Sequence, residues 1–256
     1  MRMKRKIRVA VIGCGVLGTR HAAVYSRIPW ADLVGVMDII PERARKLAAR
    51  SHTAAYDKLS DLYGKIEAAN VCVPAVSHYG VAKKLLEKDI HLLIEKPITT
   101  RLDHANDIVR IAREKNLILQ VGHIERFNSA VRYIKKIVKR PRFIECDRIG
   151  RYNPRVADVG VVLDLMIHDI DIMLYLVNSP VKDVASVGLN FLSRTEDFAN
   201  CRVLFKNNTI GNVTASRMAR DPLRKIRIFQ DNAYISLDYA NQEALISRRH
   251  NGRAVH

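Results

Sequence analysis

A glycine run at residues 13–18 constrains the fold of this chain more than any other feature of its sequence. Gly13, Gly15 and Gly18 follow an apolar stretch at 7–12 that is typical of a strand, and a helix is expected over 19–28. Glycines at this spacing allow a tight turn, a close approach of the backbone to a pyrophosphate, and close packing of the helix on the strand. The N-terminus of the helix directs free N–H groups at the phosphates. In this context the run predicts a dinucleotide-binding turn and not a plain loop.

Acidic and basic residues at later strand ends extend this predicted site. Asp38 ends the second apolar stretch, twenty residues beyond Gly18. Its carboxylate suits both hydroxyls of a ribose and repels a 2′-phosphate, so NAD is favoured over NADP. Further residues expected to contact the cofactor lie in the glycine turn or after later strands: Val16, Leu17, Pro74, His78, Glu95 and Lys96. His78 fits a helix N-terminal histidine without chemistry equally well. Lys96 at a strand end is expected to point into the crevice, with a bond to Pro97 that could be cis, and the alternative is a surface lysine in a turn.

The order of the expected elements predicts two domains. Up to residue 121, strands alternate with helices, which is typical of βαβ units and a parallel sheet. Beyond residue 122, helices at 127–138 and 159–177 precede a series of strands separated by short turns, which is typical of an antiparallel sheet. We therefore expect an α/β dinucleotide-binding domain over residues 1–121. An α+β domain with a mostly antiparallel open sheet is expected over residues 122–256.

The expected long helix at 159–177 carries the strongest chemical signal. Asp164, His168 and Asp171 are spaced i, i+4 and i+7, so they share one face of an α-helix. Carboxylates beside an imidazole fix its tautomer and suit it to general acid–base catalysis. A His–Asp pair that only joins the helix to the sheet would give the same pattern. A metal site is not expected, because no third ligand has a suitable spacing.

Three motifs together make the chain resemble the glucose–fructose oxidoreductase / inositol dehydrogenase (Gfo/Idh/MocA) family over nearly its whole length: Gly13-x-Gly15-x-x-Gly18, Glu95-Lys96-Pro97 and Asp164-x-x-x-His168. The resemblance implies a Rossmann domain, a second domain whose open sheet forms homo-oligomer contacts, and NAD(P)-dependent oxidation of a sugar or cyclitol hydroxyl, or the reverse reaction. Carried over by position, Lys96 would contact the reacting hydroxyl and the nicotinamide side. Asp164 would hold the substrate and His168, and His168 would exchange the hydroxyl proton.

Two stretches, 122–128 and 158–171, resemble the family members that act at C3 of UDP-N-acetylglucosamine. Besides Lys96, Asp164 and His168, the residues expected to bind such a substrate are Arg126, Asn128, Arg151, Tyr152, Asn153 and Arg155. Guanidinium groups suit a nucleotide diphosphate, although exposed basic residues on a basic protein would look the same. The alternatives are a cyclitol or free-sugar dehydrogenase of the same family and an inactive NAD-binding regulatory protein. Family members usually continue further, so a short second domain is expected.

The net charge and the cysteine content indicate which binding partners and which cellular compartment are expected. The net charge is +17, but it is spread over both halves of the chain, and aromatic residues make up only 6%. We therefore expect no nucleic-acid partner, and the charge fits an anionic sugar nucleotide better. The four cysteines lie more than fifty residues apart, which is typical of reduced thiols in a cytoplasmic protein. No membrane span is expected, because the longest apolar helix carries His and Asp residues.

Overall fold

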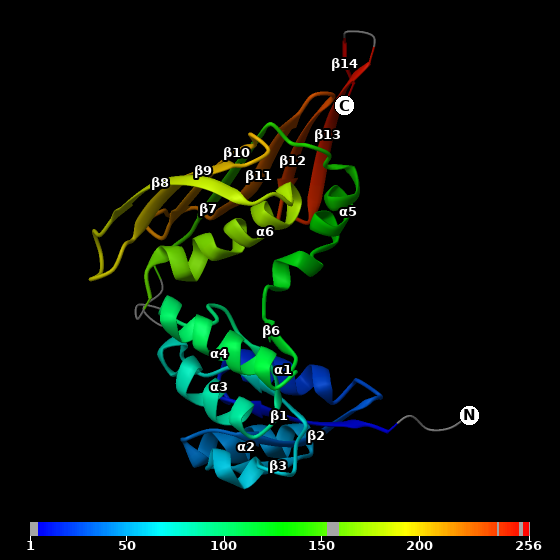
Figure 1. Ribbon diagram of the computed structural model, residues 1–256, viewed down its shortest axis with the longest axis vertical. Helices are drawn as coiled ribbons and strands as arrows, with labels where there is room; N and C mark the ends of the chain where they lie inside the picture. The colour runs from blue at the N-terminus through cyan, green and yellow to red at the C-terminus, as the bar shows by residue number, and fades with distance from the viewer. Residues whose placement is uncertain (1–4, 153–158, 240, 251–252, 256) are drawn as a thin grey trace. The chain divides into compact units, whose positions relative to one another are not determined.

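The computed structural model describes residues 5–152, 159–239, 241–250 and 253–255 of the chain. The chain divides into two compact units, Met1–Gly122 and His123–His256. Each unit has its own sheet and its own hydrophobic core (Figure 1). In the described ranges no helix has both the length and the apolar character that crossing a membrane requires.

The first unit is built on a six-stranded parallel sheet with the order β3-β2-β1-β4-β5-β6. Its strands are β1 (Ile7–Ile12), β2 (Ala31–Met37), β3 (Ala54–Tyr56), β4 (Ala68–Val71), β5 (His91–Ile94) and β6 (Leu119–Val121). Its helices are α1 (Val16–Tyr25), α2 (Pro41–Ser51), α3 (His78–Glu87) and α4 (Leu102–Glu114), with short 3₁₀ turns η1 (Leu59–Leu62) and η2 (Ala75–Ser77). The strand β3 was not expected, because three residues are too few to show an alternating pattern.

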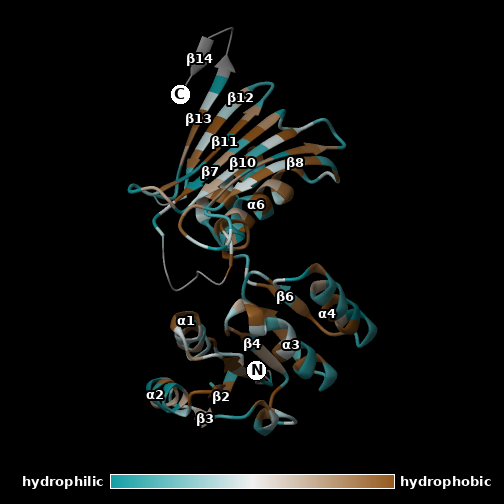
Figure 2. Cartoon of the chain, turned by 90° about the vertical axis from the view of Figure 1, so that its left-hand side faces the viewer, coloured by the Kyte–Doolittle hydropathy of each residue, from teal (hydrophilic) through white to brown (hydrophobic). Residues whose placement is uncertain are grey.

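Alternate residues of β1 face two different cores. Val11 belongs to a cluster with residues of α1 and α2, whereas Ala10 and Ile12 belong to a cluster with residues of α3 and α4. Because successive side chains of a strand point to opposite faces, the helices cover both faces of the sheet (Figure 2). The expected α/β fold of this part of the chain is confirmed.

The second unit is built on an eight-stranded sheet with the order β14-β13-β12-β11-β7-β10-β9-β8. Its strands are β7 (Phe143–Ile149), β8 (Val181–Leu189), β9 (Phe198–Phe205), β10 (Ile210–Ser216), β11 (Leu223–Gln230), β12 (Ala233–Asp238), β13 (Glu243–His250) and β14 (Arg253–Val255). Only β7 and β10 pair in parallel; the other described pairs are antiparallel. The expected α+β fold with a mostly antiparallel sheet is confirmed, although β14 was not expected.

Helices cover one face of this sheet (Figure 1). They are α5 (Ser129–Ile137), a π-helical segment η5 (Val162–Met166) and α6 (Ile167–Val177), and a short 3₁₀ turn η3 (Ile124–Phe127) precedes α5. The long helix packs on the core of the unit, since Met166, Ile172 and Leu176 are buried there. The long helix expected over 159–177 begins at Val161 in the structure, and the wider turns of η5 precede α6 within it.

Candidate active site

The three glycines of the turn between β1 and α1 have different structural roles. Gly13 has a φ of +95°, and a Cβ on it would lie 2.6 Å from the carbonyl oxygen of Cys72. A Cβ on Gly18 would lie 1.8 Å from the carbonyl oxygen of Gly13. A Cβ on Gly15, in contrast, would meet no atom within 4 Å. Gly13 and Gly18 are therefore required by the fold itself, whereas Gly15 keeps a space open beside the backbone.

Asp38 is fixed at the carboxyl end of β2 by two backbone groups. The N–H of Cys14 donates to Oδ2 at 2.8 Å, and the N–H of Ile40 donates to Oδ1 at 2.9 Å. Only 7% of the residue is exposed. The carboxylate is thus held in one orientation between the glycine turn and the start of α2, with a lone pair left on each oxygen for a further donor.

Gly13, Gly15 and Asp38 line one cavity of about 480 Å³. Six of the residues expected to contact a cofactor lie on its wall: Gly13, Gly15, Val16, Leu17, Asp38 and Pro74. Sequence reasoning missed other lining residues, which follow β2 or β4 or come from neighbouring helices: Ile39, Ile40, Arg43, Leu59, Cys72, Val73, Ser77 and Val81. Their position just beyond strand ends was the available signal, because ligands of such sheets bind at that edge.

The cavity fits a dinucleotide. The first residues of α1, Val16 and Leu17, are on its wall, and no side chain caps the N-terminus of this helix. The backbone N–H groups there are available to bind an anion, and Gly15 leaves room for its approach. The fixed carboxylate of Asp38 provides acceptors for ribose hydroxyls.

His78, like Gly18, Glu95 and Lys96, is an expected cofactor contact that is not on the wall of this cavity. It is only 1% exposed. Its Nδ1 lies 2.7 Å from the carbonyl oxygen of Pro97, and its Nε2 lies 2.9 Å from the carbonyl oxygen of Val73. The ring therefore ties together the two turns that follow β4 and β5.

Glu95 and Lys96 follow β5 directly, and the peptide bond between Lys96 and Pro97 is cis. The Oε1 of Glu95 lies 2.7 Å from Nε2 of His21, a residue of α1 that sequence reasoning did not single out. Lys96 is partly buried. Gly18, for its part, lets α1 pack closely on Gly13 in the turn after β1.

Two of the four thiols lie beside the cavity. Cys14 is buried in the glycine turn, where burial and the neighbouring Asp38 raise the pKa of its thiol to about 12. Burial likewise raises the pKa of Cys72, which lines the cavity. Both groups are therefore protonated and poorly nucleophilic near neutral pH. They contribute packing and no chemistry.

In the second unit, the expected catalytic pair lies at the junction of two helix types. Asp164 is in the π-helical segment η5, and His168 is in the first turn of α6. Both are partly buried, and the N–H of Asp164 donates to the carbonyl oxygen of Gly160 at 3.0 Å. π-Helical turns widen the backbone and are frequent at functional sites.

Asp171, the second acidic residue expected on this helix face, is a partner of Arg126. Nε and Nη2 of Arg126 donate to its two carboxylate oxygens at 2.7 and 2.6 Å. These bonds raise the pKa of the Arg126 guanidinium. The side chain of Arg126 remains 44% exposed, so a face of it is still open to solvent.

The other residues expected to bind a substrate make contacts within the chain. Asn128 caps α5, because its Oδ1 accepts from the N–H of Ala130 at 3.0 Å. Nε of Arg151 donates to the carbonyl oxygen of Arg220 at 2.6 Å. The ring of Tyr152 lies 5.3 Å from the guanidinium carbon of Arg217. Asn153 and Arg155 lie outside the described residues.

Two buried arginines, which sequence reasoning missed, bind the two ends of the segment that contains Asp164 and His168. Nε and Nη2 of Arg148 donate to Asp169 at 2.6 and 3.1 Å, and both residues are buried. Burial raises the pKa of the Asp169 carboxyl, and the charge of Arg148 opposes this shift. Arg217 donates to Oδ1 of Asp197 at 2.8 Å and to the carbonyl oxygen of Val159 at 3.0 Å.

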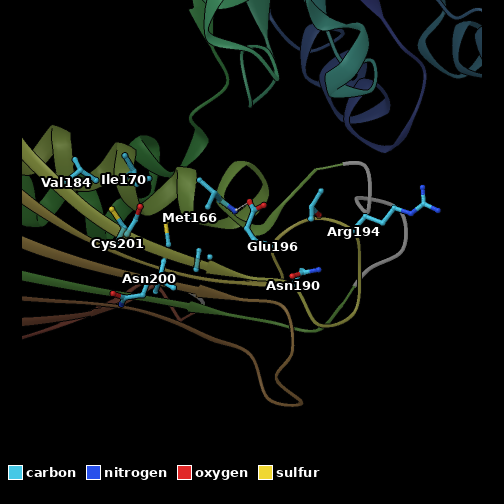
Figure 3. Close-up of a pocket in the computed structure, with 14 residues that line it drawn as sticks. Met166, Ile170, Val184, Asn190, Arg194, Glu196, Asn200 and Cys201 are labelled. Atoms are coloured by element: carbon cyan, nitrogen blue, oxygen red, sulfur yellow. Dashed lines mark hydrogen bonds between the residues drawn. The ribbon is translucent and has the colours of Figure 1, made fainter.

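A second cavity, of about 800 Å³, lies between η5, α6 and the strands β8 and β9 (Figure 3). Met166, Ile170, Val184 and Cys201 give it apolar walls, and Oε1 of Glu196 accepts from the N–H of Val162 at 3.2 Å. None of the expected site residues lines it. Among the residues that the structure describes, no three His, Cys, Asp or Glu side chains are grouped to hold a metal ion.

Comparison with known proteins matches both units to one family. Residues 7–123 match the family described as "Oxidoreductase family, NAD-binding Rossmann fold", and residues 129–236 match its "GFO/IDH/MocA C-terminal domain". The UDP-N-acetylglucosamine 3-dehydrogenase of Acidithiobacillus ferrooxidans is 35% identical over 95% of this chain and 77% of its own length. Its solved structure has a TM-score of 0.91 over 99% of this chain and 83% of that chain.

Two more distant proteins are also similar to this chain. The scyllo-inositol 2-dehydrogenase (NAD(+)) of Bacillus subtilis is 29% identical over 84% of this chain and 68% of its own length. The WlbA dehydrogenase of Bordetella pertussis, solved in complex with NADH and UDP-GlcNAcA, is 20% identical. It has a TM-score of 0.88 over 97% of this chain and 79% of that chain, which shows a shared fold.

Proposed function

Because this chain belongs to the Gfo/Idh/MocA family of NAD-binding oxidoreductases, we propose that it oxidises the C3 hydroxyl of a UDP-N-acetylhexosamine, or reduces the ketone. The observation that carries the choice of substrate is the 35% identity to the A. ferrooxidans enzyme over 95% of the chain. The relatives named for scyllo-inositol and inositol are at most 29% identical and span less of the chain, so a cyclitol is the second candidate.

The cofactor half of the proposed site is the cavity beside the glycine turn. The N–H groups at the start of α1 hold the diphosphate, and Gly15 allows the close approach that this requires. Asp38 accepts from the ribose hydroxyls with the lone pairs that Cys14 and Ile40 leave free. When bound, NAD supplies the hydride acceptor.

The proposed chemistry assigns one task to each of three side chains. His168 takes the proton from the C3 hydroxyl oxygen while the hydride leaves the same carbon. The ammonium group of Lys96 stabilises the negative charge that develops on that oxygen. Asp164 holds the substrate and orients His168, and it lies on the helical turn before His168.

The diphosphate of the substrate requires cationic partners. We propose that Arg126 is one of them, because its bonds to Asp171 fix the guanidinium while 44% of the side chain stays exposed. Arg151 and Tyr152 are further candidates, with Asn128 at the start of α5. Asn153 is proposed from the sequence alone.

Turnover of UDP-N-acetylglucosamine with NAD tests this function directly. Lys96→Ala and His168→Ala should each lower kcat by roughly 100-fold or more, because each removes a group that acts in the transition state. His104→Ala is a matched control, since His104 lies on α4 and stacks on Tyr79. Unchanged turnover in both variants would refute the assignment, and oxidation of inositol in place of the sugar nucleotide would favour the second candidate.

We also propose that the chain forms a homo-oligomer through the open face of its eight-stranded sheet. As its location in the cell we propose the cytoplasm. That face carries the aromatic group of Phe143, Phe229 and Tyr234, and Leu245 on it is 54% exposed. The four free thiols fit a reducing compartment. Leu245→Asp should lower the mass measured by light scattering, whereas a wild-type mass of a single chain would refute the oligomer.

A further inference from the structure

A hydrogen-bonded series of four side chains runs from α1 through β4 to the end of β5. The hydroxyl of Tyr25 donates to Oδ1 of Asn70 at 2.7 Å. Nδ2 of Asn70 lies 2.6 Å from Nδ1 of His21, and Nε2 of His21 lies 2.7 Å from Oε1 of Glu95. Tyr25 and His21 are on the helix that begins at the glycine turn, and Glu95 immediately precedes Lys96.

The direction of these bonds fixes the tautomer of His21. Since Oδ1 of Asn70 accepts from Tyr25, the amide nitrogen of Asn70 faces His21 and donates to Nδ1. The ring proton of a neutral imidazole then resides on Nε2, which donates it to the carboxylate of Glu95. Asn70 is buried, so exchange of these partners for water is hindered.

The carboxylate of Glu95 is also confined on its other side. A Cβ on Gly122 would lie 3.0 Å from Oε2 of Glu95, so the backbone at the end of β6 packs against this oxygen. The N–H of Glu95 donates to the carbonyl oxygen of Val71 at 3.0 Å. The glycine-turn helix, β4 and β6 therefore all contribute to the placement of the residue that precedes Lys96.

We propose that His21 is a positioning residue for the reaction: with Asn70, it holds Glu95 and thereby orients Lys96. This role rests on the proposed function, in which the ammonium group of Lys96 acts on the reacting oxygen. His21 also connects the helix that begins at the glycine turn to the turn after β5. No group of the substrate or of the cofactor needs to touch His21.

Two variants of His21 separate positioning from mere packing. In His21→Gln, the amide nitrogen can occupy the place of Nε2 and donate to Glu95. In His21→Asn, the shorter side chain reaches only the place of Nδ1 and leaves Glu95 without its donor. We expect His21→Asn to lower kcat roughly 10- to 100-fold with KM and the Kd of NADH changed less than about threefold, and His21→Gln to restore kcat to within about fivefold of wild type.

His91→Asn is the matched control, because His91 lies at the opposite end of β5 and its Nδ1 accepts from the N–H of Ile118. It should leave kcat unchanged. If His21→Gln and His21→Asn lose equal activity and equal thermal stability, His21 only packs, and the proposal is overturned. Wild-type activity in His21→Asn would overturn it as well.

The imidazole nitrogens of His21 give a readout that needs no substrate. Long-range ¹H–¹⁵N spectra of the full chain should show a proton on Nε2 and an acceptor nitrogen at Nδ1, and Glu95→Gln should shift the Nε2 resonance. A proton on Nδ1 would overturn the proposal. If wild type oxidises no sugar nucleotide, the proposed function fails, while these spectra still decide whether His21 holds Glu95.

Discussion

Replacement of Asp38 by alanine should weaken NAD binding by an amount that follows from the bonds in the structure. Oδ1 and Oδ2 each accept one backbone N–H, from Ile40 and Cys14, and each keeps a lone pair for one ribose hydroxyl. A hydrogen bond to a charged group contributes about 1.5–3 kcal/mol. Two such bonds at the lower value amount to about 3 kcal/mol, which is roughly a 150-fold increase in Kd.

The same substitution should change the preference between the two dinucleotides. The carboxylate of Asp38 repels a 2′-phosphate, and Arg43 lies on the wall of the same cavity. Without the carboxylate, the guanidinium of Arg43 is left beside the position of that phosphate. The affinity for NADP should therefore rise while that for NAD falls.

Titration of the intrinsic fluorescence of NADH and NADPH measures both affinities. Asp32→Ala is the control, because Asp32 is exposed on the same strand and the change in net charge is identical. A melting curve of each variant separates loss of the two backbone bonds from loss of the ribose contacts. A change in the Kd of NADH of less than about threefold in a folded Asp38→Ala variant would refute ribose recognition by this residue.

Three further predictions concern the glycine turn and the charged groups. Gly15→Ala should leave the melting temperature unchanged and weaken NADH binding. Gly18→Ala should lower the melting temperature, because its Cβ would meet a backbone oxygen at 1.8 Å. Equal melting temperatures of the two variants would contradict this. Arg148→Met should cost about 3–5 kcal/mol in urea unfolding, because it leaves a buried carboxylate unpaired; a cost below about 1 kcal/mol would contradict this. A hydrogen bond from Arg110, among others, lowers the pKa of Asp107 from 3.8 to about 2. The ionised carboxylate of Asp107 therefore stabilises the fold above about pH 4, and this stabilisation is lost as the pH falls towards 2. Asp107→Asn should flatten the fall in melting temperature over that range, and an unaltered slope would count against it.

Local signals in the sequence predicted the first unit closely. The bounds of β1 agree with the apolar stretch expected at 7–12, because the strand is a short apolar run that ends at the glycine turn. The glycine turn and Asp38 were found for the same reason, since their spacing is set within one βαβ unit. The placement of His78 and the bond from His21 to Glu95 depend on packing between distant segments, so no local pattern indicated them.

The second unit was predicted less completely, because the helix that carries the proposed catalytic residues depends on long-range ion pairs. An α-helical spacing placed Asp164, His168 and Asp171 on one face, but η5 widens the backbone before α6. Asp171 is bound by Arg126, a residue far away in the sequence. A regular period cannot show a change of helix type, and it cannot show which cation a carboxylate will meet.

A usable signal for the buried arginines was nevertheless present in the strands. In β7, the inward positions are Ile144, Cys146 and Arg148, so strict alternation already places a guanidinium in the core. In β10, the inward positions Val213 and Ala215 lead to Arg217 by the same parity. A buried guanidinium requires a buried carboxylate, because an unpaired charge in the core is too costly.

The partners of these two arginines lie next to the segment that carries the proposed catalytic residues, and this explains why an apolar pair would not serve equally well. β7 and β10 are adjacent and parallel, so both guanidinium groups emerge at the same end of the sheet. Arg148 binds Asp169, the neighbour of His168, and Arg217 binds the carbonyl oxygen of Val159, just before η5. Apolar contacts lack direction and would tolerate rotation of the helix, whereas a bidentate ion pair fixes it. The end of the sheet thus sets the rotation of the helix that presents Asp164 and His168.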